Sequence, residues 1–121
     1  MKWLNLALLL CSLFLSGCAL IDQYQCPRLN LYQMGLNDAE NGSFKQNVDP
    51  KIQICKKYNP NLNAAQYSAG YAKGLKRYCD PTYAYQLGTQ GVVYHSVCSR
   101  VKQKKANAAW HRGLRHYCIP S

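Results

Sequence analysis

Cysteine is the residue type of this chain best suited to covalent chemistry, and Cys18 has the most informative surroundings. It directly follows Leu15-Ser16-Gly17, behind an apolar run that begins after Lys2. A charged start, an apolar stretch and small residues at the cleavage point are what a secretory signal requires. A cysteine just after that point is typical of bacterial lipoproteins. We therefore expect residues 1–17 to be removed as a signal peptide and the Cys18 thiol to be acylated through a thioether.

The expected lipid would hold the mature chain on a membrane. The apolar run is shorter than the roughly 20 residues of a membrane-spanning helix, whereas several acyl chains together bind strongly, at about 0.8 kcal/mol per buried methylene. Residues 18–25 would then be the lipidated cysteine and a short polar tether, and residues 26–121 one small domain. Ala19 stands where Asp would favour the inner membrane, so we expect the outer membrane, on its periplasmic face.

Cys118 is a second candidate for chemistry, because a thiolate beside a base is a nucleophile. His111 lies seven positions earlier, on the same face of a helix, whereas His116 points elsewhere. This pair supports an alternative function, a hydrolase or thiol enzyme acting on envelope material. We favour a non-enzymatic binding or assembly module, because the sequence has no Ser-His-Asp set, phosphate loop or dinucleotide fingerprint.

No cofactor is expected. Asp38 is expected to tether a turn or to pair with a lysine.

The remaining cysteines indicate disulfides rather than a metal site. Small exported domains are commonly stapled by disulfides, because their cores alone are marginal. No CxxC pair occurs, and the spacings of 24, 19 and 20 residues between the last four cysteines suit the ends of separate elements better than a zinc cluster. The disulfide candidates are Cys26, Cys55, Cys79 and Cys98, and Cys118 is the candidate free thiol.

The charge of the chain is strongly positive. Fifteen Lys and Arg face five Asp and Glu, a formal net charge of +10. An export signal makes nucleic acid an unsuitable partner, so we expect an anionic envelope component: lipopolysaccharide, phospholipid or peptidoglycan. Runs of basic residues are usually solvated surface. The densest run of this chain is the expected basic surface, made of Arg100, Lys102, Lys104 and Lys105.

Hydrophobic spacing and helix breakers predict an all-α fold, a small disulfide-stapled bundle of about four short helices with one long loop. The loop covers 43–61, with one helical turn at 52–57. The predicted helices cover 28–41, from 61 or 63 to 79, 83–100 and 104–118. The basic run would then lie between the last two helices.

An aromatic-x-x-Gly pattern repeats along these helices. Residues 71–79 and 110–118 also share a longer pattern that ends in Tyr-Cys, with Pro two residues later. Glycine inside a helix costs about 1 kcal/mol relative to Ala, so its repetition indicates a compensating contact. We expect close helix crossings, with an aromatic ring of one helix on the bare backbone of another. The pattern occurs at Tyr32–Gly35, Tyr67–Gly70, Tyr71–Gly74, Tyr85–Gly88 and Trp110–Gly113.

These motifs resemble a family of small Gram-negative lipoproteins known only as a domain of unknown function. Its members are similar in a lipobox, a Cys before aromatic-x-x-Gly-x-x-Asp-Gly-x-x-Gly, a lone Cys, and two further blocks that each end in Cys. Those blocks are Tyr-x-x-Gly-x-x-x-Gly-Leu-x-x-Tyr-Cys and Leu-Gly-x-x-Gly-x-x-Tyr-x-x-x-Cys. The resemblance covers roughly residues 26–98 and implies no activity. Two departures are Ala39, where the pattern has Gly, and Cys118, which lies outside the pattern.

The order of the helices predicts which cysteines meet. If consecutive helices run antiparallel, Cys26 and Cys79 share one end of the bundle, and Cys55 and Cys98 share the other. We therefore expect bonds between Cys26 and Cys79 and between Cys55 and Cys98, with Cys118 unpaired. The same argument also permits a bond between Cys79 and Cys118, which would leave Cys26 free.

Overall fold

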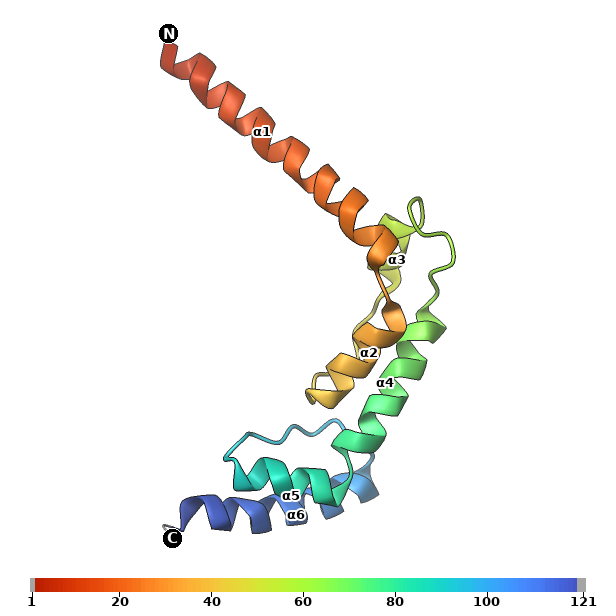
Figure 1. Ribbon diagram of the computed structural model, residues 1–121, viewed down its shortest axis with the longest axis vertical. Coiled ribbons are helices and arrows are strands. Elements are labelled where there is room, and N and C mark those ends of the chain that lie inside the picture. The colour runs from red at the N-terminus through yellow and green to blue at the C-terminus, as the bar shows by residue number, and fades with distance from the viewer. Residues whose placement is uncertain (1, 120–121) are drawn as a thin grey trace.

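The structure is a computed structural model that describes the backbone of residues 2–119 and the side chains of residues 2–11 and 23–119. The described backbone holds six α-helices, one 3-10 helix and no strand (Figure 1). The expected all-α class and disulfide stapling are confirmed. The elements are α1 (Lys2–Gln25), η1 (Cys26–Arg28), α2 (Leu31–Glu40), α3 (Asp49–Cys55), α4 (Ala64–Tyr78), α5 (Pro81–Thr89) and α6 (Arg100–Cys118).

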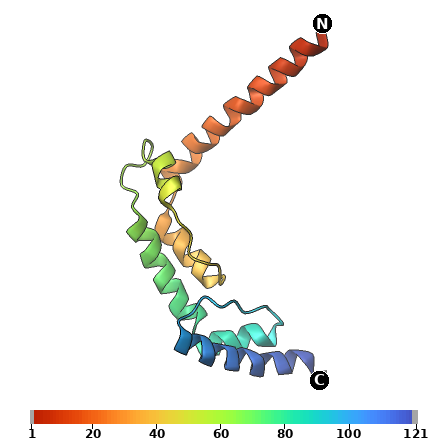
Figure 2. The ribbon, with the colours of Figure 1, turned by 180° about the vertical axis from the view of Figure 1, so that it is seen from behind.

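Helix α1 includes residues 2–17 of the expected signal peptide and continues through the expected tether. It extends away from the other helices in both ribbon views (Figures 1 and 2). Among the described residues, no helix combines the length and the apolar character needed to cross a membrane. The side chain of Cys18, which we expect to be acylated, lies outside the described residues, as do those of Leu15-Ser16-Gly17.

Side-chain caps set the starts of α2 and α4. Asn30 accepts a hydrogen bond from the backbone N–H of Gln33 at 3.0 Å, so α2 begins three residues later than predicted. Asn63 and Gln66 exchange side-chain hydrogen bonds with each other's backbone N–H groups, which forms a capping box. The helix predicted to end at 79 is therefore confirmed, and of the two predicted starts the one at 63 is correct, since Asn63 is the cap.

The helix predicted over 83–100 is wrong in its second half. Helix α5 ends at Thr89, and Gly91 adopts a φ of +70°. Glycine favours this left-handed conformation, which ends a helix. Residues 90–99, which we call the strap, then run back along α5 (Figure 1). Helix α6 starts at Arg100 rather than at Lys104.

The long helices after η1 pack as two pairs, α2 with α4 and α5 with α6 (Figures 1 and 2). A Cβ added at Gly35 would meet the backbone of Tyr67, and one added at Gly74 would meet the backbone of Leu36. The contacts therefore advance together along α2 and α4, so these two helices run parallel. The contacts between α5 and α6 follow the same order.

The glycines allow the close helix crossings that the repeat predicts, but most of the contacts differ in kind. A Cβ on Gly70 would overlap the carbonyl oxygen of Tyr32, so the helix backbones themselves touch. An aromatic ring lies on glycine at the end of the helix instead, where the ring of Tyr78 covers Gly42. Glycine thus lets the two helix backbones touch at the centre of the pair, at Gly70, and lets an aromatic ring pack on the backbone at the end of α2, at Gly42.

Two disulfides join Cys26 to Cys55 and Cys79 to Cys98. The predicted pairing of Cys26 with Cys79 and of Cys55 with Cys98 is wrong, and so is the alternative bond between Cys79 and Cys118. The prediction assumed antiparallel neighbours. Because each pair is parallel, the segment between its helices must return to the starting end. An extended segment of ten residues, at roughly 3.3 Å per residue, easily spans a helix of nine residues that rises about 1.5 Å per residue.

Each helix pair has its own buried core. The core between α2 and α4 also takes in a residue just before α3, and it consists of Leu31, Ala39, Val48, Tyr67 and Tyr71. The core between α5 and α6 is made of three alanines, with half-buried aromatic residues packed around them. These alanines are Ala84, Ala106 and Ala109.

Candidate functional site

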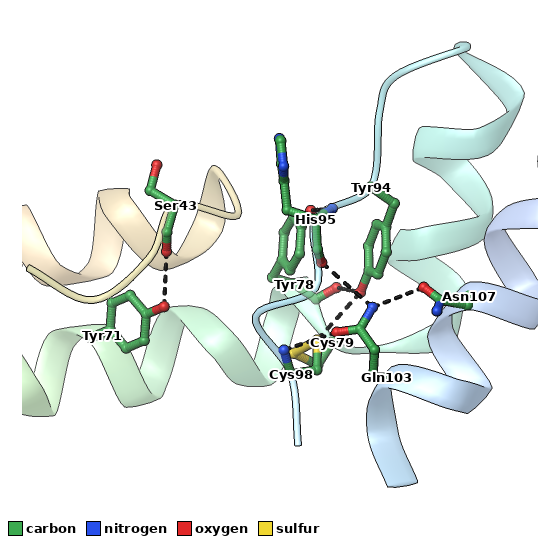
Figure 3. Close-up of a disulfide and its surroundings, with 9 residues drawn as sticks. All are labelled: Ser43, Tyr71, Tyr78, Cys79, Tyr94, His95, Cys98, Gln103 and Asn107. Carbon is green, nitrogen blue, oxygen red and sulfur yellow. Dashed lines mark hydrogen bonds between the residues drawn. A yellow bond between two sulfur atoms is a disulfide. The ribbon is translucent and has the colours of Figure 1, made fainter. Parts of the chain in front are cut away.

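The strap covers the last turn of α4 and the residue after it (Figure 3). The rings of Tyr78 and Tyr94 stack with their centroids 4.6 Å apart and 1° between their planes. Cys98 of the strap bonds to Cys79. We call these four residues the closed junction. Tyr78 is 2% exposed and Cys79 is 5% exposed, so the strap shields both from solvent.

Hydrogen bonds fix the strap on this junction (Figure 3). The Tyr94 hydroxyl donates to the carbonyl oxygen of Tyr78 at 2.6 Å, and the Tyr78 hydroxyl accepts from the backbone N–H of His95 at 2.7 Å. Gln103 of α6 accepts from the backbone N–H of Cys98 at 3.0 Å. Burial raises the pKa of both tyrosines, so both hydroxyls keep their protons well into the alkaline range.

Asp38 ties the segment after α2 to α4, in agreement with its expected role as a tether. Its carboxylate accepts from the Tyr67 hydroxyl at 2.6 Å and from the side-chain amide of Gln46 at 2.8 Å. Burial, followed by the hydrogen bond to Asp38, raises the pKa of Tyr67 to about 12. The neighbouring Tyr71 hydroxyl donates to the carbonyl oxygen of Ser43 at 2.8 Å (Figure 3). This region is built to hold a turn.

The residues of the expected basic surface lie in the first two turns of α6, not between two helices as predicted, and all of them are exposed: Arg100, Lys102, Lys104 and Lys105. The first turn of α6 holds no acidic residue. A helix N-terminus carries a partial positive charge, so cations there are unfavourable by some tenths of a kcal/mol each. The fold therefore carries these charges without a compensating acid in that turn.

Basic residues of two helices converge beside the closed junction. Lys76 of α4 and Lys102 of α6 border one pocket of about 220 Å³ that also contacts the Cys79–Cys98 disulfide. A described acidic residue near the end of α2, Glu40, pairs with Arg77 at 3.8 Å. Within the part of the chain whose side chains are described, neither Lys76 nor Lys102 has an acidic partner, so both can bind an anion from outside.

Cys118 is a free and exposed thiol. It lines a shallow pocket of about 380 Å³ together with His111 and Arg115, so the shared face predicted for Cys118 and His111 is present. The imidazole of His111 lies edge-on to the ring of Trp110, with centroids 4.9 Å apart, and no hydrogen bond joins it to the thiol within the described residues. The side chains are neighbours, without the hydrogen bond of an activated thiol–base pair.

No metal site is formed by the described side chains. Within residues 2–11 and 23–119, His, Cys, Asp and Glu form no group of three or more that could hold an ion. Four of the cysteines are consumed by the disulfides.

Sequence reasoning missed the part that Tyr94 plays, because it placed this residue in a helix. Gly91 is followed by Val92-Val93. Glycine commonly ends a helix and β-branched residues favour extended backbone, so these three residues are the signal that could have revealed the strap.

The sequence matches the family model described as "Protein of unknown function (DUF2799)" over residues 30–119. It is also 26% identical over 108 residues to the uncharacterized protein YfiL of Escherichia coli (strain K12), an alignment that covers 86% of this chain and 84% of that protein. No solved structure matches the chain. The similar proteins carry no described activity that could be transferred.

Proposed function

Because the chain belongs to the DUF2799 family, whose function is unknown, we propose from its own residues that it is a lipoprotein of the bacterial cell envelope. Cys18 anchors it in the outer membrane, on the periplasmic face. Its helical domain is a non-enzymatic binding or assembly module. The partner is an anionic envelope component, namely lipopolysaccharide, phospholipid or peptidoglycan.

The anchor is supported by the Leu15-Ser16-Gly17-Cys18 motif behind an apolar run. Two disulfides in a chain of this size fit an oxidising compartment, which an exported protein reaches. Membrane attachment then rests on the acyl chains of Cys18.

The binding role rests on one observation, the cluster of exposed cations at the start of α6. Arg100 and Lys102 stand at the positive end of the helix dipole with no acid in the first turn, and Lys102 shares a pocket with Lys76. Near an anionic surface each basic residue contributes about 1 kcal/mol of attraction. An arrangement that is unfavourable in the free protein becomes favourable when a polyanion is bound.

The anchor is tested by labelling cells with palmitate. The natural chain should incorporate label, and globomycin, which blocks lipoprotein signal peptidase, should make the unprocessed precursor accumulate. The Cys18→Ser variant should take up no label, whereas the matched Cys11→Ser variant should remain labelled, because Cys11 lies in the segment that is removed. An unlabelled natural chain that is free in the periplasm would show the anchor to be wrong.

The binding role is tested with the full lipidated protein in neutral detergent micelles and beads coated with lipopolysaccharide or peptidoglycan. Changing Lys102, Lys104 and Lys105 together to Gln should weaken retention by roughly tenfold or more, since three attractions of about 1 kcal/mol are lost. Rising salt should reduce the retention of the natural chain. The matched control changes Lys51, Lys56 and Lys57, which are also exposed, to Gln. Equal losses in both triple variants would contradict a specific role for α6.

A further inference from the structure

The two helix pairs repeat one set of backbone contacts. Gly74 of α4 lies against the backbone of Leu36 in α2, and Gly113 of α6 lies against the backbone of Tyr85 in α5. We call residues 26–78 the first unit and residues 79–117 the second unit. Each unit is a pair of parallel helices joined by a segment that returns to the starting end.

The first helix of each pair also ends in the same way. Gly42 and Gly91 both adopt left-handed backbone, with φ of +71° and +70°. Gly42 lies against the ring of Tyr78, and Gly91 lies against the ring of Tyr117. Tyr117 in the second unit therefore corresponds to Tyr78 in the first.

A hydrogen bond after these glycines confirms the correspondence. In the first unit the Tyr71 hydroxyl donates to the carbonyl oxygen of Ser43 at 2.8 Å. In the second unit the indole N–H of Trp110 donates to the carbonyl oxygen of Val92 at 2.7 Å. Ser43 and Val92 each follow the left-handed glycine, so different side chains make the same link at the same place.

The cysteines mark where each unit begins. Cys26 precedes α2 and bonds to Cys55, which lies between α2 and α4. Cys79 precedes α5 and bonds to Cys98, which lies between α5 and α6. Cys118 follows Tyr117 as Cys79 follows Tyr78, and in both places Pro comes two residues later. Cys118 thus occupies the position at which a unit begins.

This third starting position is uncovered. Tyr117 is 61% exposed, whereas Tyr78 is 2% exposed under the strap. Cys118 is free and exposed, whereas Cys79 is bonded. No described residue covers Tyr117 and Cys118 as the strap covers their counterparts. We call Tyr117 and Cys118 the open junction.

We infer that the open junction binds an extended segment of another polypeptide, in which an aromatic residue is followed four positions later by a cysteine. The aromatic ring stacks on Tyr117 as Tyr94 stacks on Tyr78. The cysteine of the segment forms a disulfide with Cys118. This interaction does not depend on the lipid anchor or on the basic cluster at the start of α6.

A second copy of this chain does not fit the open junction. Its Tyr94 and Cys98 are already engaged in the closed junction. Its own Cys118 ends a helix rather than lying on an extended segment, and Arg112 and Arg115 would bring like charges together. The expected partner segment is therefore extended and carries no net positive charge.

The disulfide forms by exchange. The partner's cysteine arrives in a mixed disulfide with a small thiol, left by a disulfide oxidant. The thiolate of Cys118 attacks the partner's sulfur, a new sulfur–sulfur bond forms, and the old one breaks. The departing small thiol takes the electron pair of the broken bond, and it takes up one proton for the one that Cys118 releases. No further oxidant or reductant is needed.

The probe is a synthetic peptide with the sequence of residues 90–99, whose cysteine is activated as a mixed disulfide with pyridine-2-thiol. The full chain in detergent micelles is mixed with this peptide, and release of the thione is followed by absorbance. Peptide mass mapping identifies the coupled cysteine. The matched peptide carries Ala in place of the tyrosine. An aromatic pair contributes a factor of roughly two to ten, so the tyrosine peptide should couple to Cys118 about fivefold faster.

Two protein variants and one condition complete the test. Tyr117→Ala should reduce the ratio of the two peptide rates to about one, and unfolding in urea should do the same. Cys118→Ser should abolish coupling at this position. Equal rates for the two peptides on the folded natural chain would overturn the proposal and leave Cys118 as an ordinary thiol. If oxidation instead joins Cys118 of two copies faster than the peptide couples, the partner is a second copy and the inference is wrong.

Discussion

Gly70 shows how a missing side chain sets the distance between two helices. A Cβ at this position would overlap the carbonyl oxygen of Tyr32, and a Cβ at Gly74, one turn later, would also meet the backbone of α2. With two such contacts on one face of α4, the helix cannot relieve an overlap by a small tilt. The intrinsic preference of helices for Ala and the tertiary packing therefore oppose each other at this residue.

We predict that Gly70→Ala destabilises the protein by about 1–2 kcal/mol. The change gains about 1 kcal/mol of helix propensity, but forcing a methyl group into a packed contact costs roughly 1–3 kcal/mol, and here the obstacle is backbone. The measurement is urea unfolding followed by far-UV circular dichroism. As a control, Ala72→Gly, at an exposed position of the same helix, should lose about 1 kcal/mol through propensity alone. A Gly70→Ala protein more stable than the natural chain would show that the helices can separate freely.

At the scale of elements, the strap holds the two units together. It turns back at the left-handed Gly91, stacks Tyr94 on the end of α4 and reaches Cys79 through Cys98. The strap therefore belongs to the second unit by sequence but covers the end of the first. Its removal should affect the junction before it affects either helix pair.

We predict that changing Cys79 and Cys98 together to Ser lowers the free energy of unfolding by roughly 2–4 kcal/mol, as expected for one disulfide. The strap should also become open to protease, so chymotrypsin should cut after Tyr94, which the closed junction protects in the natural chain. The matched variant changes Cys26 and Cys55 to Ser, and there the cut after Tyr94 should stay slow. Continued protection of Tyr94 without the Cys79–Cys98 bond would mean that stacking alone holds the strap.

Local signals predicted part of this architecture, and the missing part is long-range. The helix that ends at Tyr78 could be predicted because Asn63 and Gln66 cap it and its apolar spacing is regular. The direction of its partner, α2, could not be predicted, since a connection of about twenty residues permits a parallel or an antiparallel arrangement of the two helices. The error in the disulfide pairing followed from that choice. Only the glycine contacts in space, such as Gly35 with Tyr67, decide it.

The same limit applies to the candidate site. The basic residues of α6 could be recognised by residue type alone, and Cys118 could be singled out as the free thiol because it lies outside the pattern of the family. The placement of the basic residues could not be predicted, because a helix predicted to end at 100 put Arg100 at the end of the wrong helix and Lys102 in a loop. The correspondence between Tyr117 and Tyr78 was visible in the repeated pattern, but its meaning required the strap.

At the scale of the whole molecule, the two units differ in the size of their cores. The first buries Leu31, Val48 and two tyrosines, whereas the buried residues of the second are alanines. Burial of apolar surface stabilises by about 25 cal/mol per Å², and an alanine side chain offers little surface. We therefore expect the second unit, which carries the basic cluster and Tyr117 of the open junction, to be the less stable of the two.

We predict that hydrogen exchange is faster in α6 than in α4. Local opening follows the stability of each region. The central amides of α4 should therefore exchange only at about the rate of global unfolding, whereas those of α6 should exchange much faster. The measurement is exchange of the full chain in detergent, read by mass spectrometry of peptides from the two helices. Coupling the activated peptide of residues 90–99 to Cys118 should slow exchange at the end of α6 and leave α4 unchanged, because the added segment covers Tyr117. Equal exchange in both helices of the free chain would show that the units unfold together, and the larger first core would then stabilise the second through the closed junction.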